Sequence, residues 1–424
     1  MLTAPIRGYS TVNAIYNRKD ILVPASIYIL IVSALLCNVA VYLYQHFPTS
    51  YTWEELFINY EGGFIRRGLV GQILLLVDSA LPMPIFYVTL FSAIFMVFLY
   101  ISYKKLTNVF DPIVVQFIFI SPVIFLLHIN DKIFFGRKDL FIEIILLCIA
   151  QSCINCLEKK HIYKSTLLIS ILFIMGMLIH EMIIFYFPIF AVLLGVAYAR
   201  QEKIFQWLFI TGVLFSVTLL LGLVFSGNAC MSKAICASWA LRYPELTCKG
   251  AISYLSVPLY GYVTDTSLHH TNWVSMGSVF LGLVLSSIPM IFLWKAYRPY
   301  TAVQSLLSNS RVLRLAFWPA VFAPFVISVI ANDFGRHIST AFLSYIFFLY
   351  AVFSVQPQPA APWLHKLKKK ISVPSRLRYA YLCAFVYGLC WRMTHWQPVG
   401  ESYVQPGEVL RFFYHKLGLF VIFP

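Results

Sequence analysis

Four short clusters of ionisable residues interrupt an otherwise apolar sequence. They are Glu61-Gly62-Gly63-Phe64-Ile65-Arg66-Arg67-Gly68, Gly136-Arg137-Lys138-Asp139, His180-Glu181 and Asp333-Phe334-Gly335-Arg336-His337. Arginine offers a fork of N–H donors that matches phosphate oxygens, and Glu, Asp and His can accept or release a proton. These residue types suit a reaction in which a phosphate group is held while a hydroxyl group is deprotonated.

The first cluster places a carboxylate a few residues before two adjacent arginines. A carboxylate beside a phosphate-binding pair can act as a general base toward a sugar hydroxyl. We therefore expect Glu61 to be catalytic, and Arg66 and Arg67 to bind phosphate. The alternative is that both arginines extend to lipid headgroups and Glu61 is merely solvated.

The second cluster precedes a long apolar run. Asp139 opens that run and Glu143 follows four residues later, so both carboxylates share one helix face. An ionisable group inside a membrane is costly and usually has a partner, and Arg137 is the natural partner for Glu143. We expect Asp139 to be a second catalytic carboxylate, Arg137 a phosphate ligand and Glu143 a supporting residue. A structural ion pair at a helix end is the alternative.

His180 and Glu181 lie at a turn between two apolar runs and are expected to support the site. Helix capping would explain them almost as well. The sequence after Glu181 is Met-Ile-Ile with no second His, so the His-Glu-x-x-His pattern of metalloproteases is absent. The identity of any metal ligands therefore stays unknown.

The fourth cluster combines three ionisable residues where apolar sequence resumes at once. Arg336 and His337 suit a pyrophosphate, and Asp333 is expected to be catalytic or to orient one of them. The Asp-Phe-Gly sequence is not a kinase signature here, because the chain has no other kinase element.

The elements that must position these clusters are membrane helices. Of the 424 residues, 60% are hydrophobic and only 12% are charged, which excludes a soluble domain. Apolar runs of about 18 residues, each long enough to cross a bilayer, recur along the whole chain. The fold class expected is an all-α polytopic transmembrane bundle of about eleven spans. We place them at 21–45, 83–103, 112–128, 140–157, 165–181, 182–199, 207–226, 274–297, 314–331, 338–355 and 378–392.

The distribution of charge predicts an orientation. With the amino terminus inside, about 20 of the 32 basic residues fall on inner loops, as the positive-inside rule requires. The net charge of +15 then reflects topology, so a nucleic-acid partner is not expected. In this orientation all four clusters lie on the outer face.

The chain is expected to form a single membrane domain, 1–424, with two notable outer loops. The first, 46–82, contains an amphipathic stretch at 64–81 that predicts a helix lying along the interface. The second, 227–273, contains Cys230, Cys236 and Cys248. A disulfide between Cys236 and Cys248 is favoured because it closes a short loop, and a zinc site is the weaker interpretation because the spacing is irregular.

An inner amino terminus, a first outer loop with an acidic residue and an interfacial helix, and ten to thirteen spans resemble the GT-C superfamily of membrane glycosyltransferases. The four clusters also resemble those of polytopic proteins from bacterial O-antigen and capsule loci. The resemblance implies a donor sugar or oligosaccharide on polyprenyl phosphate or pyrophosphate, and a glycan or lipid-linked acceptor. It further implies an extracytoplasmic site in the bacterial inner membrane, with Glu61 as the loop carboxylate. The family's Asp is a Glu here, and the large extracytoplasmic domain of many relatives is missing.

Two function classes follow from these observations. The first is an inverting glycosyltransferase, acting on single sugars or as a repeat-unit polymerase. It needs no nucleotide cofactor, and a divalent cation at the phosphate is compatible with it. The second is a transporter or flippase of lipid-linked sugar. Transporters commonly show repeated halves and charges near the membrane midplane, whereas here the charges gather on one face, which favours the enzyme.

Overall fold

The computed structural model describes residues 25–78, 82–158, 160–256, 273–308, 310–330 and 333–371, with short pieces between 379 and 406. The regular secondary structure of the described residues is helical apart from one short antiparallel pair, β1 (Trp391–Met393) with β2 (Val404–Pro406). The first ten helices are α1 (Ala25–Gln45), α2 (Tyr51–Phe57), α3 (Gly68–Val77), α4 (Met83–Thr107), α5 (Pro112–Phe119), α6 (Leu127–Asn130), α7 (Asp139–Leu157), α8 (Ile162–Ile179), α9 (Ile183–Tyr186) and α10 (Pro188–Ala199). The others are α11 (Ile204–Val224), α12 (Ala229–Ala240), the 3₁₀ turn η2 (Ser253–Ser256), α14 (Trp273–Tyr297), α15 (Pro299–Leu307), α16 (Arg311–Ile330), α17 (Phe334–Val355) and α18 (Pro362–Ile371).

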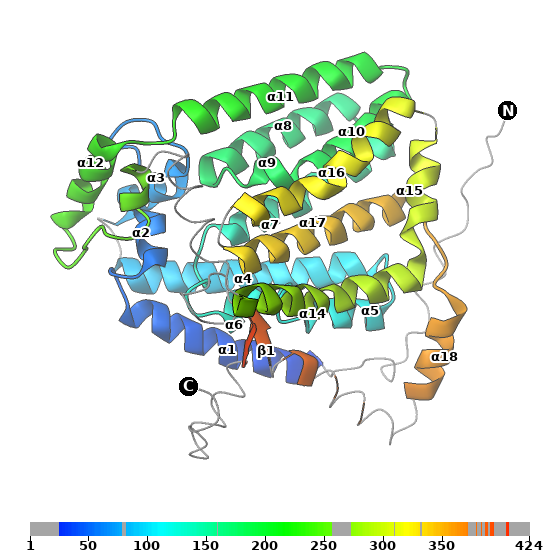
Figure 1. Ribbon diagram of the computed structural model, residues 1–424, viewed down its shortest axis with the longest axis horizontal. Helices are drawn as coiled ribbons and strands as arrows, with labels where there is room; N and C mark the ends of the chain where they lie inside the picture. The colour runs from blue at the N-terminus through cyan, green and yellow to red at the C-terminus, as the bar shows by residue number, and fades with distance from the viewer. Residues whose placement is uncertain are drawn as a thin grey trace.

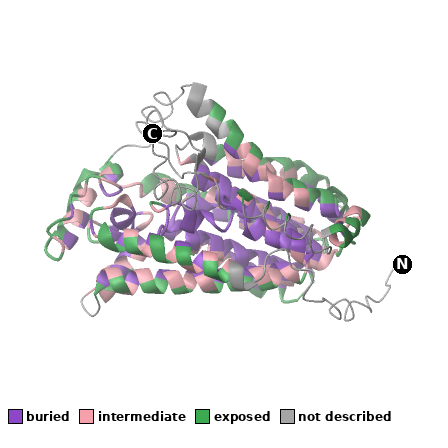
Figure 2. Cartoon of the chain, turned by 90° about the horizontal axis from the view of Figure 1, so that it is seen from below, coloured by how far each residue is buried: buried purple, intermediate pink, exposed green. Residues whose placement is uncertain are grey.

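Seven helices in the described part of the chain are long and apolar enough to cross a membrane. They are α1, α4, α7, α8, α11, α14 and α17. Helices α7 and α17 pack against each other and are the most enclosed, whereas the outer surfaces of α1 and α11 are largely exposed and apolar. Figure 2 shows buried residues gathered in the middle of the bundle and exposed residues around its outside. An apolar exterior around a buried centre is what a helix bundle in lipid requires. The chain is therefore a polytopic membrane helix bundle.

Two of the expected spans are interrupted. The run 112–128 contains α5, of only 8 residues, then turns and the one-turn α6. Pro122 explains the break, because a proline disfavours helical backbone at the residue before it and removes a hydrogen bond. The run 182–199 is divided into α9 and α10, with Pro188 at the first position of α10. Both interrupted segments are almost wholly buried, so their irregular backbone is enclosed by protein.

The other expected spans have helical counterparts, except the last. α16 covers 314–331 closely but contains Pro319 and Pro324. The last expected span, 378–392, falls mostly outside the described residues. Eleven spans and an inner amino terminus stay predictions.

Five of the shorter helices lie at the two ends of the bundle. The long helices run roughly side by side in Figure 1, with α2, α3 and α12 at one end and α15 and α18 at the other. The lysine-rich α18 is thus remote from both loops that carry α2, α3 and α12. The amphipathic stretch expected at 64–81 forms a helix over the ten residues of α3. Gly71 allows α3 to approach α2, because a Cβ atom there would lie 2.1 Å from the carbonyl oxygen of Ile58.

The two loops at this end form one packed unit. The Trp239 indole on α12 donates a hydrogen bond to the carbonyl of Phe57 at 2.8 Å. Cys236 and Cys248, the expected pair, are joined by a disulfide bond. The Glu54 carboxylate accepts hydrogen bonds from the backbone N–H groups of Gly250 at 2.6 Å and Ile252 at 3.4 Å. Helix α2 is therefore held from the side opposite the bundle.

Candidate functional site

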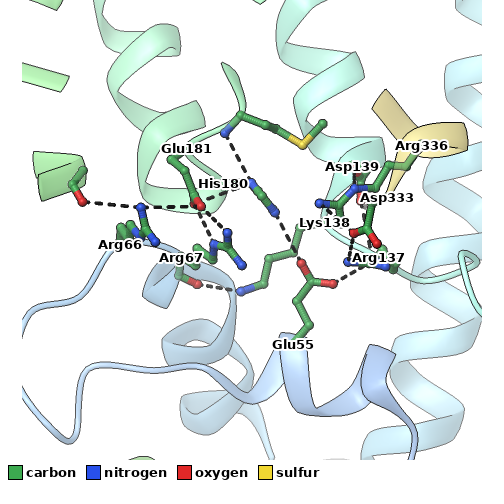
Figure 3. Close-up of polar contacts among 12 residues, drawn as sticks. Glu55, Arg66, Arg67, Arg137, Lys138, Asp139, His180, Glu181, Asp333 and Arg336 are labelled. Atoms are coloured by element: carbon green, nitrogen blue, oxygen red, sulfur yellow. Dashed lines mark hydrogen bonds and ion pairs between the residues drawn. The ribbon is translucent and has the colours of Figure 1, made fainter. Parts of the chain in front are cut away.

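Side chains from five separate segments converge where α2 meets the bundle (Figure 3). They come from α2, from the residues before α3, from the residues before α7 and its first turn, from the turn between α8 and α9, and from the start of α17. The charged members are Glu55, Arg66, Arg67, Arg137, Lys138, Asp139, Glu181, Asp333 and Arg336. Of the four sequence clusters, each contributes at least two members to this one polar site.

Glu55 occupies the centre of the site and is 1% exposed. Its Oε2 lies 2.8 Å from Nε of Arg137, and its Oε1 lies 3.5 Å from Nε2 of His180. Burial by itself would raise the pKa of this carboxyl, but Arg137, His180 and Arg336 outweigh it and hold the pKa well below its usual range. Glu55 is therefore ionised at neutral pH.

His180 is oriented by its own turn. Its Nδ1 accepts the backbone N–H of Met182 at 3.3 Å, which places the ring proton of the neutral form on Nε2, toward Glu55. Burial and the nearby Arg67 lower the pKa of His180, although Glu181 opposes them. The imidazole is thus neutral at neutral pH, and its Nε2 faces the Glu55 carboxylate at 3.5 Å.

Helix geometry explains why adjacent glutamates on α2 have different roles. Successive residues on a helix point about 100° apart, so Glu54 and Glu55 cannot face the same neighbours. Glu54 reaches the backbone of Gly250 and Ile252, just beyond the disulfide-bonded Cys248, whereas Glu55 reaches Arg137 and His180. Only Glu55 belongs to the site.

Arg137 and Arg336 are bridged by carboxylates from two helices. Asp333 Oδ2 lies 3.6 Å from Nη2 of Arg137 and 3.2 Å from Nη2 of Arg336. Asp139 Oδ1 lies 3.4 Å from Nε of Arg336, and its Oδ2 lies 3.9 Å from Nε of Arg137. The Arg137 guanidinium also lies 5.1 Å from the centre of the Tyr51 ring. Asp333 is the most exposed of these groups, at 17%, and so marks the open side of the pair.

Arg66 and Arg67 face Glu181 on the other side of Glu55. Arg67 donates from Nε to Glu181 Oε2 at 2.6 Å and from Nη2 to Oε1, which makes a two-pronged pair. Arg66 is farther, with Nη1 3.7 Å from Glu181 Oε1. Arg67 has φ 71°, a conformation that few residues with side chains adopt, and it forms the N-cap of α3.

Lys138 lies between the two halves of the site and is fully buried. Its Nζ donates to the carbonyl oxygen of Arg67 at 2.6 Å. Burial lowers the pKa of Lys138 to about 7, because the attraction of Glu55 and Glu181 is opposed by Arg67 and Arg137. At neutral pH this ammonium is close to losing its proton.

Three sequence-based expectations, those for Glu61, Glu143 and His337, differ from the arrangement found. Glu61 is exposed and lies outside the site, and its backbone N–H donates to the side chain of Asn59. Glu143 does not pair with Arg137. Its Oε2 lies 2.8 Å from Nε2 of His128, deep in the bundle and enclosed by aromatic rings. Arg137 points away because it belongs to the loop before α7, whereas Glu143 lies one turn deeper.

His337 faces the core beside the site. Its Nδ1 lies 3.2 Å from the hydroxyl of Tyr186, and the side chain is fully buried. It therefore contacts the bundle interior rather than the pair of arginines that includes its neighbour Arg336.

Sequence reasoning assigned no role to three residues of consequence: Glu55, Lys138 and His128. Glu55 has the same residue type and loop as Glu61, and its neighbours Trp53, Leu56 and Phe57 are all buried apolar residues. A charged residue inside such an apolar stretch is the signal that would have favoured Glu55 over Glu61. Lys138 carried a comparable signal, since Phe134 and Phe135 precede it and Leu140 follows soon after.

In the described part of the chain, no three His, Cys, Asp or Glu side chains are grouped so that they could hold a metal ion. The chemistry of the site is instead that of four arginines facing four carboxylates, Glu55, Asp139, Glu181 and Asp333. Such arginines can exchange a carboxylate partner for a phosphate, while an ionised carboxylate beside them stays available as a base.

Comparison of the chain with protein-family models, curated proteins and solved structures finds no match. The interpretation of the site therefore depends on its own geometry and on the motifs that form it.

Proposed function

We propose that this chain is a membrane glycosyltransferase of surface-polysaccharide assembly. Its donor is a sugar or oligosaccharide linked to polyprenyl phosphate or pyrophosphate, and its acceptor is a glycan or lipid-linked hydroxyl. The observation that carries the proposal is the convergence of four arginines around an ionised, buried glutamate at one end of a membrane helix bundle. A lipid-linked phosphate brings its anionic headgroup to this depth while its tail stays among the helices.

The arginines hold the leaving phosphate. Arg137 and Arg336 are the pair next to Glu55, and they share Asp333, a carboxylate that is 17% exposed. Phosphate oxygens replace Asp333 as the partners of these two guanidinium groups. The guanidinium groups then neutralise the negative charge that grows on the phosphate as the glycosidic bond breaks. Arg67 is bound in a two-pronged pair to Glu181 and serves mainly to fix the loop before α3.

Glu55 is the base in this proposal, in place of the exposed Glu61. When Arg137 binds the donor phosphate, its ion pair with Glu55 weakens. That ion pair lowers the pKa of Glu55, so its carboxylate then becomes a better proton acceptor. It then removes the proton of the acceptor hydroxyl, whose oxygen attacks the anomeric carbon. The C–O bond to the phosphate breaks with inversion, and the phosphate leaves as the lipid-linked anion.

The active face is the outer face of a bacterial inner membrane. The lysine-rich α18 lies at the other end of the bundle from α2, which agrees with lysines inside and the site outside. The disulfide between Cys236 and Cys248 lies at the same end as the site, where an oxidising compartment would maintain it.

The test is product formation by purified protein. The chain is reconstituted in nanodiscs with undecaprenyl-linked oligosaccharides extracted from a strain that makes a surface polysaccharide. We expect a new glycosidic bond, read by mass spectrometry as an extended lipid-linked glycan and released undecaprenyl phosphate or pyrophosphate. Extension by whole repeat units indicates a polymerase, and extension by one sugar indicates a single-sugar transferase.

The competing class gives a different result. A flippase moves lipid-linked sugar between the leaflets of a proteoliposome and leaves it chemically unchanged. Transfer of the lipid between leaflets without product would overturn the enzyme proposal and favour the transporter.

A further inference from the structure

Lys138 is a charged side chain of the site whose neighbouring carboxylates form their ion pairs with arginines. Glu55 is paired with Arg137, and Glu181 with Arg66 and Arg67. The Nζ of Lys138 instead donates to a neutral acceptor, the carbonyl oxygen of Arg67. The side chain is fully buried, so bulk water does not compensate its charge.

The charges around Lys138 come from every element packed against it. Glu55 belongs to α2, Arg67 precedes α3, Glu181 follows α8 and Arg137 adjoins Lys138 itself. Farther out lie Asp139, Asp333 and Arg336, and the neutral His180 faces Glu55. Without Lys138, four arginines face four carboxylates and the site is electrically balanced.

We infer that Lys138 takes up a proton when the anionic donor binds, and so supplies the positive charge that the bound phosphate requires. This inference rests on the proposed function, because it concerns the same phosphate site. Lys138 acts here as a ligand-responsive cation, bound by hydrogen bond to the loop before α3.

Physical chemistry requires this coupling once an anion enters. In the free protein, burial and the flanking arginines favour the neutral amine, with a pKa of about 7. A phosphate placed among the same arginines adds negative charge close to Nζ, and an opposite charge within a few ångströms favours the ammonium form. By linkage, the ligand that raises the pKa of Lys138 binds more weakly as the pH rises above the free-state pKa.

The probe is methyl farnesyl phosphate, a phosphodiester whose single negative charge does not titrate near neutral pH. Its affinity for the full chain in nanodiscs is measured by calorimetry from about pH 6 to about pH 9, which brackets the pKa of Lys138. Each titration is repeated in two buffers of different ionisation enthalpy, which gives the number of protons taken up on binding. Farnesol measures the contribution of the tail alone.

For the unaltered chain we expect proton uptake approaching one per ligand above neutral pH. The dissociation constant should rise by up to tenfold per pH unit there. Lys138→Met retains the length and the apolar stem and should bind weakly, with no pH dependence in this range. Lys138→Arg retains the charge at all these pH values, so its affinity should be nearly constant. Lys233→Met removes an exposed lysine of α12 and should behave as the unaltered chain.

Two outcomes would overturn the inference in distinguishable ways. Binding without proton uptake in the unaltered chain, or equal pH dependence in Lys138→Met, refutes the role of Lys138 and leaves the phosphate site intact. Absence of binding in the unaltered chain at every pH refutes the phosphate site itself, and with it the proposed function. The measurement on the unaltered chain decides the matter even where a Lys138 variant fails to fold.

Discussion

Replacing Glu55 by Gln separates the structure-based assignment of the base from the sequence-based one. Gln keeps the length of the side chain, and its one amide oxygen can face either Arg137 or His180, but it cannot take a proton. Loss of one general base lowers the rate by about a hundredfold to ten-thousandfold. That range corresponds to about 2.7–5.5 kcal/mol in the activation free energy.

The fold should survive this change. Removing one partner of a buried ion pair costs about 3–5 kcal/mol when the other charge is left alone. Here Arg137 keeps Asp333 at 3.6 Å and Asp139 at 3.9 Å, so it is not left alone. We therefore expect a smaller loss of stability for Glu55→Gln, with normal membrane insertion and a similar elution volume.

Glu61→Gln is the matched control, because it makes the same chemical change in the same loop at an exposed position. Initial rates of product formation from a lipid-linked donor are compared for the two variants and the unaltered chain. Near-normal activity in Glu61→Gln with a large loss in Glu55→Gln supports Glu55 as the base. Full activity in Glu55→Gln would refute the assignment, and a loss confined to Glu61→Gln would restore the sequence-based candidate.

Three further predictions concern stability. Glu143→Leu removes the hydrogen-bond partner of the buried His128 Nε2 and should cost about 1–3 kcal/mol in thermal unfolding, whereas adding His128→Phe should recover much of it; no recovery would mean that the pair is not coupled. Lys138 has a pKa of about 7 in the fold, against an ordinary value of 10.5, so the unfolded chain binds more protons between these values. The free energy of unfolding should therefore rise with pH across that window. Lys138→Met should remove this rise, and an identical pH profile in both proteins would contradict the prediction. Cys236→Ser with Cys248→Ser opens a 12-residue separation and should cost about 2–4 kcal/mol in the loops around α12; unchanged proteolysis of these loops would show that the disulfide contributes little.

The membrane class and most helices could be predicted because long apolar runs leave few alternatives in lipid. Helix α4 and the run 83–103 differ only at their ends. The interruptions of 112–128 and 182–199 were missed, since hydropathy averages over a window and does not register a single buried proline. Pro122 and Pro188 carried that information locally.

Convergence of the four clusters could be anticipated, because motifs placed on one face of a bundle by charge asymmetry have little room to separate. Which residues pair with each other within the site could not be predicted. Whether Glu54 or Glu55 turns toward the bundle depends on how α2 is rotated, and Glu54 accepts hydrogen bonds from the backbone of Gly250 and Ile252, far along the chain. Contacts between residues so distant in sequence leave no local pattern to detect.

The most direct measurement of the central claim is a cryo-electron microscopy structure of the chain with a non-transferable lipid-linked donor analogue. We predict the phosphate density between the guanidinium groups of Arg137 and Arg336, within hydrogen-bonding distance of both, with Asp333 displaced from them and the Glu55 carboxylate facing the acceptor side. Density for the headgroup elsewhere on the bundle, with Arg137 and Arg336 still bridged by Asp333, would contradict the account.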